Sequence, residues 1–189
     1  MKLKALMIGS VAASLVLAGC GGSTEGQTPP GGQVPSATAS EGQGAPRTGP
    51  AKAVEIADKC SVVSESQWKA AGADQKPRER TSNDKPGCQY QKGMAGTPGW
   101  GAFVAVSGGA SYAQTIGETA REPVKVGDVA GYPVTEFKIG DGCVLYADVA
   151  DNGFLIANVT KLSPEDPGAD LCQVAERFTE AAVQNLPNA

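Results

Sequence analysis

Histidine is absent from the 189 residues of this chain. Without imidazole the protein cannot build a Ser-His or Cys-His nucleophile or a histidine-ligated zinc site, which excludes the commonest hydrolase and metalloenzyme designs. Aromatic residues are scarce, at 5% of the chain, although 41% of all residues are hydrophobic and suffice for one modest core. These values favour a single domain without a cofactor, and they favour binding over catalysis.

An excess of positive charge is missing as well. The formal net charge is -4, and a chain that begins at Cys20 keeps 14 basic against 20 acidic residues, a net charge of -6. Nucleic-acid binding needs clustered cations that displace counterions. We therefore expect no nucleic-acid partner.

A long apolar run is also missing, because residues 5–19 are fewer than the roughly 20 that a membrane-spanning helix needs. Two lysines precede this run, as in a secretory signal. The stretch Leu17-Ala18-Gly19-Cys20 matches the bacterial lipobox, whose thiol takes a diacylglyceryl group before cleavage. We expect residues 1–19 to be a signal peptide and Cys20 to anchor the protein stably to the outer face of a bacterial cell membrane. An ordinary cleaved signal with an incidental cysteine is the alternative.

Residues 20–50 contain almost only Gly, Pro, Ser, Thr, Ala and Gln after the cysteine. Such a segment cannot repay its ordering entropy by burial, so it is predicted to be a disordered tether that spans roughly 30 Å as a coil. Its composition also resembles O-mannosylated bacterial stretches, but a bare spacer is favoured. The folded unit is then residues 51–189, a single domain.

Strand patterns dominate the second half of this domain. The turn signals Gly140-Asp141-Gly142 and Asp151-Asn152-Gly153 divide residues 131–160 into three β-rich runs, which predicts an antiparallel meander. Residues 88–91 and 101–106 could add two strands, and residues 111–120 could be a helix or a loop between these strands and the meander. Residues 74–85 are interpreted as a solvated loop.

Helices are predicted at both ends of the domain. Ser64 and Gln67 have the spacing of a capping box that opens a short helix. Near the C-terminus, Asp166 is expected to cap a helix whose apolar positions recur at helical spacing; these are Leu171, Ala175, Phe178, Ala182 and Leu186. This amphipathic helix needs a sheet to cover, so the predicted fold is α+β, with an antiparallel sheet of about five strands.

Four cysteines remain in the domain once Cys20 is acylated. An even number in an exported domain predicts two disulfides, for which three pairings are possible. We favour the sequential set, because it closes the shortest loops and places a strand and its covering helix side by side. It joins Cys60 to Cys88 and Cys143 to Cys172. A zinc cluster is disfavoured, because the chain has no C-x-x-C pair.

Four stretches follow the predicted anchor and tether in a characteristic order. They are DKCSVVSESQWKAAG at 58–72, GCQYQ at 87–91, DGCVLYADV at 141–149 and DLCQVAERFTEAAVQNLP at 170–187. This layout resembles the actinobacterial lipoproteins catalogued as domain of unknown function thirty-five fifty-eight, over nearly the whole chain. The family usually shows Asp-Pro-Cys and Cys-x-Trp at the first two cysteines, where this chain has Lys59 and Tyr90. The resemblance implies a surface lipoprotein of a high-GC Gram-positive bacterium, and it implies no activity.

One motif points to catalysis. Ser66 and Lys69 fit the S-x-x-K pattern of penicillin-recognising enzymes. The companion motifs of that family are missing and the domain is far smaller, so we interpret both residues as solvated helix positions. A Ser/Lys hydrolase is the less favoured alternative, and no catalytic residue, metal site or cofactor is expected.

Trp100 is the candidate binding residue. It lies between Gly99 and Gly101, a setting that often lets an indole lie on a ligand or sugar face. The alternative, which is the more frequent one for such a residue, is that it folds back to plug the edge of the sheet. The predicted function is a non-catalytic binding, accessory or sensing module that contacts the membrane through its lipid anchor. Its further partner would be an envelope protein or a small molecule. A small-molecule or lipid carrier, with an apolar pocket between sheet and helix, is the other alternative.

Overall fold

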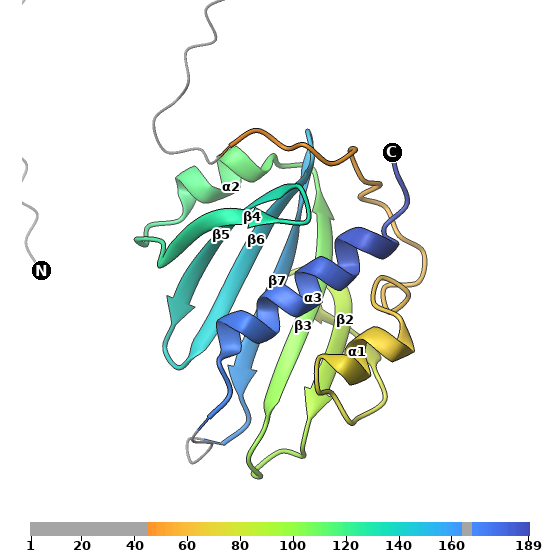
Figure 1. The fold of residues 1–189 in the computed structure, drawn as a ribbon, viewed down its shortest axis with the longest axis vertical. Coiled ribbons are helices and arrows are strands. Elements are labelled where there is room, and N and C mark those ends of the chain that lie inside the picture. The colour runs from red at the N-terminus through yellow and green to blue at the C-terminus, as the bar shows by residue number, and fades with distance from the viewer. Residues whose placement is uncertain (1–44, 164–167) are drawn as a thin grey trace, which may run out of the picture. The chain divides into compact units, whose positions relative to one another are not determined.

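The domain is built on one antiparallel sheet of seven strands, in the order β1-β2-β3-β7-β6-β5-β4. The computed structural model describes residues 45–163 and 168–189, and Figure 1 shows the sheet behind its long helix. The α+β class is confirmed, but the strand count exceeds the predicted five. The strands are β1 (Arg78–Ser82), β2 (Lys85–Lys92), β3 (Trp100–Gly108), β4 (Lys125–Val129), β5 (Tyr132–Ile139), β6 (Gly142–Ala150) and β7 (Gly153–Lys161).

Three helices accompany the sheet. The longest, α3 (Leu171–Asn185), lies across one face, and α1 (Glu65–Ala70) packs beside it (Figure 1). The short α2 (Tyr112–Glu118) belongs to the opposite face, because the Tyr112 hydroxyl lies 2.5 Å from the hydroxyl of Thr135, whose neighbours on β5 point toward α3. The two faces of the sheet are therefore covered by different helices.

The predicted meander is confirmed as β5, β6 and β7. Strands β6 and β7 are buried on both faces along most of their length, which explains their nearly unbroken apolar sequences. The C-terminal helix is also confirmed, but its predicted cap is wrong. Helix α3 begins at Leu171, and the Asp170 side chain accepts the N–H groups of Cys172 and Gln173; Asp166 lies outside the described residues.

The sequence missed the two edge strands. β1 lies within the predicted solvated loop, and four of its five residues are exposed, so no apolar alternation marks it. The turn between β1 and β2 uses Asn83 and Asp84 with φ of 48° and 58°, and the turn between β4 and β5 uses Ala130 and Gly131 with φ of 54° and 89°. Positive φ at both central residues is typical of tight hairpins. The residues of these two turns are the sequence feature that could have indicated the edge strands.

The N-terminal segment of the domain meets the C-terminal end of the chain just beyond α3. Lys52 is buried, and its ammonium donates to the carbonyl oxygen of Leu186 at 3.1 Å and to the Asn188 side chain at 3.0 Å. Cations are favoured at helix C-termini, so this contact fixes the N-terminal segment on α3. No helix in residues 45–163 or 168–189 is long and apolar enough to cross a membrane.

Residues 45–50, which the sequence assigned to the tether, also contact the domain. The guanidinium of Arg47 lies 2.8 Å from the Asp148 carboxylate and 2.5 Å from that of Asp151. The N–H groups of Thr48 and Gly49 both donate to the carbonyl oxygen of Gly131 at 2.9 Å. These contacts hold the start of the described chain close to the β6–β7 turn.

Candidate functional site

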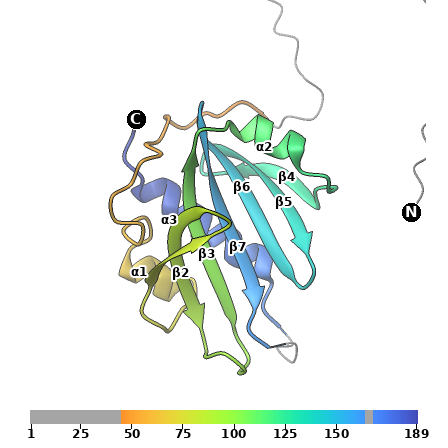
Figure 2. The ribbon, with the colours of Figure 1, turned by 180° about the vertical axis from the view of Figure 1, so that it is seen from behind.

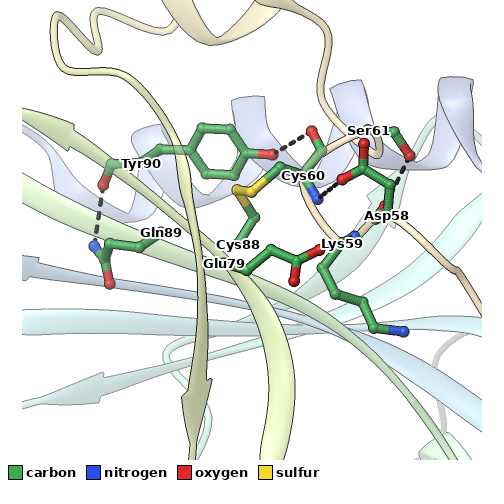
Figure 3. The surroundings of a disulfide bond; sticks show 8 residues. All are labelled: Asp58, Lys59, Cys60, Ser61, Glu79, Cys88, Gln89 and Tyr90. Carbon is green, nitrogen blue, oxygen red and sulfur yellow. Dashed lines mark hydrogen bonds between the residues drawn. A yellow bond between two sulfur atoms is a disulfide. The ribbon is translucent and has the colours of Figure 1, made fainter.

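The first disulfide joins Cys60, in the loop before α1, to Cys88 on β2 (Figure 3). The Asp58 carboxylate accepts the N–H of Cys60 at 2.9 Å, and Glu79 on β1 accepts the N–H of Lys59 at 3.1 Å. The loop is thus tied to both strands of the β1–β2 hairpin. The second disulfide joins Cys143 on β6 to Cys172 on α3, and both bonds have the predicted sequential pairing.

Tyr90 connects the first disulfide to the core. Its hydroxyl donates to the carbonyl oxygen of Cys60 at 3.3 Å, and its ring centroid lies 4.9 Å from that of Phe178 on α3. Burial raises the pKa of the Tyr90 phenol, and the negative charge of Asp58 adds to the rise. Tyr90 is therefore a neutral hydrogen-bond donor that supports the loop.

A buried carboxyl lies beside the second disulfide. Glu136 on β5 is 3% exposed, and a carboxylate oxygen lies within 4.8 Å of the sulfurs of Cys143 and Cys172. Both sulfurs are used in the disulfide, so they offer no thiolate to a metal ion. Lys125 on β4 lies 3.5 Å from Glu136 and forms a closer ion pair with Glu176 on α3. The cluster joins an edge strand, the sheet and the helix.

The environment of Glu136 favours its neutral form. Burial is the largest cause, and the nearby Glu176 adds to it, so the pKa of Glu136 rises from 4.5 to about 7 despite the opposing charge of Lys125. The hydrogen bond from Lys125 lowers the pKa of Glu176. The two carboxyls therefore differ in their readiness to ionise, with Glu136 holding the proton.

Replacing Glu136 with glutamine is expected to flatten the pH dependence of stability between pH 5 and pH 8. Between the ordinary pKa of 4.5 and the folded-state pKa of about 7, the unfolded chain has lost the Glu136 proton while the folded chain still binds it. The free energy of unfolding of the native protein therefore falls as pH rises toward 7 and levels off above it. From pH 5 to pH 8, the free energy of unfolding of the glutamine variant should rise by about 1–3 kcal/mol relative to that of the native protein. Urea denaturation at both pH values measures this change. Glu180→Gln, at an exposed position of α3, is the control and should keep the slope; an unchanged slope in Glu136→Gln would refute the assignment.

A groove opens where β2 leaves β3. In the part of the chain that the structure describes, pairing between these strands stops at Cys88 and Val104, and the next residues, Gly87 and Ala105, are not paired. Pro86 is the next residue of β2 beyond Gly87, and it has no backbone N–H to donate to the ladder. Because β1 stays paired with β2 here, the hairpin leaves the plane of the sheet as a unit, and its tip curls over the face of the sheet that lies opposite α3 (Figure 2).

This β2–β3 groove has a volume of about 760 Å³ and is lined by residues 54–57, 59, 84–86 and 106–108. The volume lies within the range of ligand sites in proteins. The lining combines apolar Ile56 and Val106 with two acids and two lysines. Lys85 lies over the Phe154 ring at 5.6 Å from its centroid, and the Lys59 ammonium donates to the carbonyl oxygen of Ile56. The charges therefore border the groove without defining an anion or cation site.

A family model described as protein of unknown function DUF3558 matches residues 15–185. The chain belongs to this family. No curated protein and no solved structure matches the chain. The match begins before Cys20 and ends within α3, so it includes both disulfides and both walls of the groove.

The assignment of Trp100 of this DUF3558 protein as an exposed binding residue is wrong, and the alternative that it folds back into the core is confirmed. Its side chain is 2% exposed, and its ring meets Phe178 of α3 edge-on, with 5.8 Å between centroids. The neighbouring glycines serve strand packing rather than mobility. A Cβ on Gly99 would lie 2.1 Å from the carbonyl oxygen of Lys92, so only glycine allows this approach of β3 to β2.

The two S-x-x-K residues of the DUF3558 domain each contact a different neighbour rather than each other. Ser66 and Lys69 are both exposed on α1. The Lys69 ammonium lies 2.5 Å from the Glu65 carboxylate, while the Ser66 hydroxyl lies 3.2 Å from the hydroxyl of Ser64. The Gln67 side chain accepts the N–H of Ser64 at 2.9 Å, as expected for a capping box. The motif is explained by helix capping and a surface ion pair.

Two features of the DUF3558 domain have only weak signals in the sequence. The sequence signal for the groove is Pro86, because a proline inside a strand marks a sheet edge or a break in pairing. The sequence signal for the burial of Glu136 is its inward position in an alternating strand. The interface between the sheet and α3, where the carrier alternative needed a pocket, is occupied at its centre by the contacts of Phe178 with Tyr90 and Trp100.

Proposed function

We propose that this DUF3558 protein is a non-catalytic binding module, held at the outer face of a bacterial cell membrane by a lipidated Cys20, that contacts an envelope partner at the β2–β3 groove. The observation that carries the proposal is the groove itself, a hollow of about 760 Å³ next to the middle of the sheet. The family gives no activity, and the domain offers the S-x-x-K pair no coupled geometry.

The anchor part of the proposal is supported by the lipobox-like stretch and by a family match that starts at Leu15, ahead of Cys20. Two acyl chains supply the two anchoring signals that stable membrane attachment needs. The contacts of Arg47 hold the start of the described chain at the β6–β7 turn. The predicted tether would therefore join the domain near the groove, because Gly109, next to the groove wall, donates to Asn152 of that turn.

Mutation of Cys20 to alanine is expected to move the protein out of the membrane fraction. Mass spectrometry of the native protein should find an N-terminal peptide that begins at a diacylated Cys20. Fractionation of cells that express Cys20→Ala gives the comparison, with Cys20 as the sole change. A native protein recovered from the cytosol with an intact Met1 would contradict the anchor.

Cross-linking from inside the groove is expected to capture the partner. A photo-crosslinking amino acid in place of Lys85, in the groove wall, should form a defined adduct in intact cells. The same residue in place of Met94, which is 63% exposed in the β2–β3 loop, is the control and should not. Adducts that are equal at both positions, or absent from position 85, would contradict a functional groove. Digestion of the adduct by protease, glycosidase or lipase identifies its chemical class.

A further inference from the structure

The main chain of β3 has one open side at the groove. A Cβ built on Gly153 would lie 2.8 Å from the carbonyl oxygen of Ser107, so this carbonyl points toward β7. Gly109 donates its N–H to Asn152 at 2.9 Å, which continues the same pattern two residues later. Because polar groups of successive strand residues point to opposite sides, the N–H and C=O of Val106 point away from β7 and into the groove.

Strand β2 does not supply the ladder partners that these two groups of Val106 would normally have. Pro86 on β2 would stand opposite if the pairing of Cys88 with Val104 continued, but it lacks the N–H that would bond the Val106 carbonyl. The Gly87–Ala105 pair, which would accompany a bond from the Val106 N–H to Pro86, is not formed. Val106 therefore offers a donor and an acceptor at strand spacing inside a sheet rather than at its outer edge.

We propose that an extended peptide segment of a partner protein adds to β3 as a strand at Val106 and fills the β2–β3 groove. This inference rests on the proposed function and names the class of its ligand. The donor and acceptor of Val106 match one residue of a neighbouring antiparallel strand. The charged groups at the groove number two acids, Glu55 and Asp84, and two bases, Lys59 and Lys85. This balance selects no charged ligand and suits recognition of main chain.

The two walls of the groove also set the side chains that the added strand can carry. The residue opposite Val106 would point to the α3 side, toward Ile56 and Val62, where an adjoining hollow measures about 10 Å³. Only a small apolar side chain fits there. The residues before and after it would point to the other side, where Lys85 lies over Phe154. The groove therefore favours a small apolar residue flanked by polar residues.

The test uses the full-length chain in detergent and a phage-displayed library of linear heptapeptides. Enriched peptides are synthesised and their affinities measured by calorimetry. N-methylation of the peptide residue that bonds Val106 should weaken binding about tenfold or more, and N-methylation of the next residue should have little effect. No enriched peptide, or binding that tolerates N-methylation at every position, would overturn the proposal. This readout leaves the protein unchanged.

A pair of protein variants gives an independent readout. Val106→Pro removes the N–H that faces the groove and leaves the bonds between β3 and β7, so it should weaken peptide binding about tenfold or more. Val106→Ala changes the side chain only and should bind within about threefold of the native chain. Circular dichroism establishes that both are folded; if Val106→Pro unfolds, the N-methylated peptides decide.

Failure of strand addition and failure of the proposed function give different results. A cross-link from position 85 to a glycan or a lipid, without any enriched peptide, would keep the binding function and overturn strand addition. If peptides bind in the predicted manner but no cross-link forms in cells, the groove can accept an added strand, and the proposed function at the envelope is overturned.

Discussion

Replacing Trp100 with alanine is expected to lower the free energy of unfolding by about 3–5 kcal/mol, the usual cost of deleting a buried large aromatic side chain. The indole is 2% exposed and packs edge-on against Phe178. The alanine variant would leave a cavity between the start of β3 and the middle of α3, because α3 is packed along the sheet and cannot move in to fill the space. Urea denaturation followed by tyrosine fluorescence measures the loss.

Met94→Ala is the control for this experiment, because Met94 is 63% exposed in the adjacent loop and its truncation should change stability by less than about 0.5 kcal/mol. Phe178→Ala should cost about as much as Trp100→Ala, and the double variant should cost less than the sum, since the two rings share one contact. A loss below about 1 kcal/mol for Trp100→Ala would mean that the indole is not packed in the core.

Removal of either disulfide is expected to lower the free energy of unfolding by about 3–4 kcal/mol, from the loop-closure entropy that each bond removes from the unfolded chain. The paired cysteines are 28 and 29 residues apart, so the two losses should be similar. Alanine is the appropriate replacement, because Cys88 and Cys143 are fully buried and a serine hydroxyl there would add a desolvation cost. The variants are Cys60→Ala with Cys88→Ala, and Cys143→Ala with Cys172→Ala.

Non-reducing peptide mapping is the companion measurement. It should recover one peptide pair that contains Cys60 and Cys88, and another that contains Cys143 and Cys172. A peptide that joins Cys60 to Cys172 would refute this pairing, and free thiols in the isolated protein would refute the framework. Losses that differ strongly between the two double variants would show that contacts around one bond, such as those of Glu136, dominate over chain entropy.

The separation of β2 from β3 connects the fold to the proposed role. The central strands of a sheet normally satisfy each other's main chain, and an open segment inside a sheet invites a strand from another molecule. Here Pro86 stops the ladder while β1 keeps the hairpin paired. The result is a bounded site, since only residues near Val106 are accessible, rather than a long free edge that would promote aggregation.

The cysteine pairing and the central elements could be predicted from the sequence because their signals are local. Turn residues at Gly140 and Asn152 mark the two turns inside the meander, and the apolar spacing of residues 171–186 marks the covering helix. Pairing of neighbouring cysteines follows from that order, since Cys143 opens a strand and Cys172 opens the helix that covers it. The leader and the lipobox at Cys20 depend on no tertiary contact, and they stay predictions.

Tertiary structure alone decided the rest. The edge strands β1 and β4 carry few apolar residues, so they are strands only because β2 and β5 offer them hydrogen-bond partners. From the sequence, the glycines beside Trp100 suggested an exposed indole. In the structure they allow a close approach between neighbouring segments. Pro86 marked a break, but the direction in which the hairpin turned, and the groove that this turn opened, depend on residues 54–57 and 106–108, which are distant in sequence. Burial and strand pairing are properties of such distant contacts, and a single sequence determines them only through the fold.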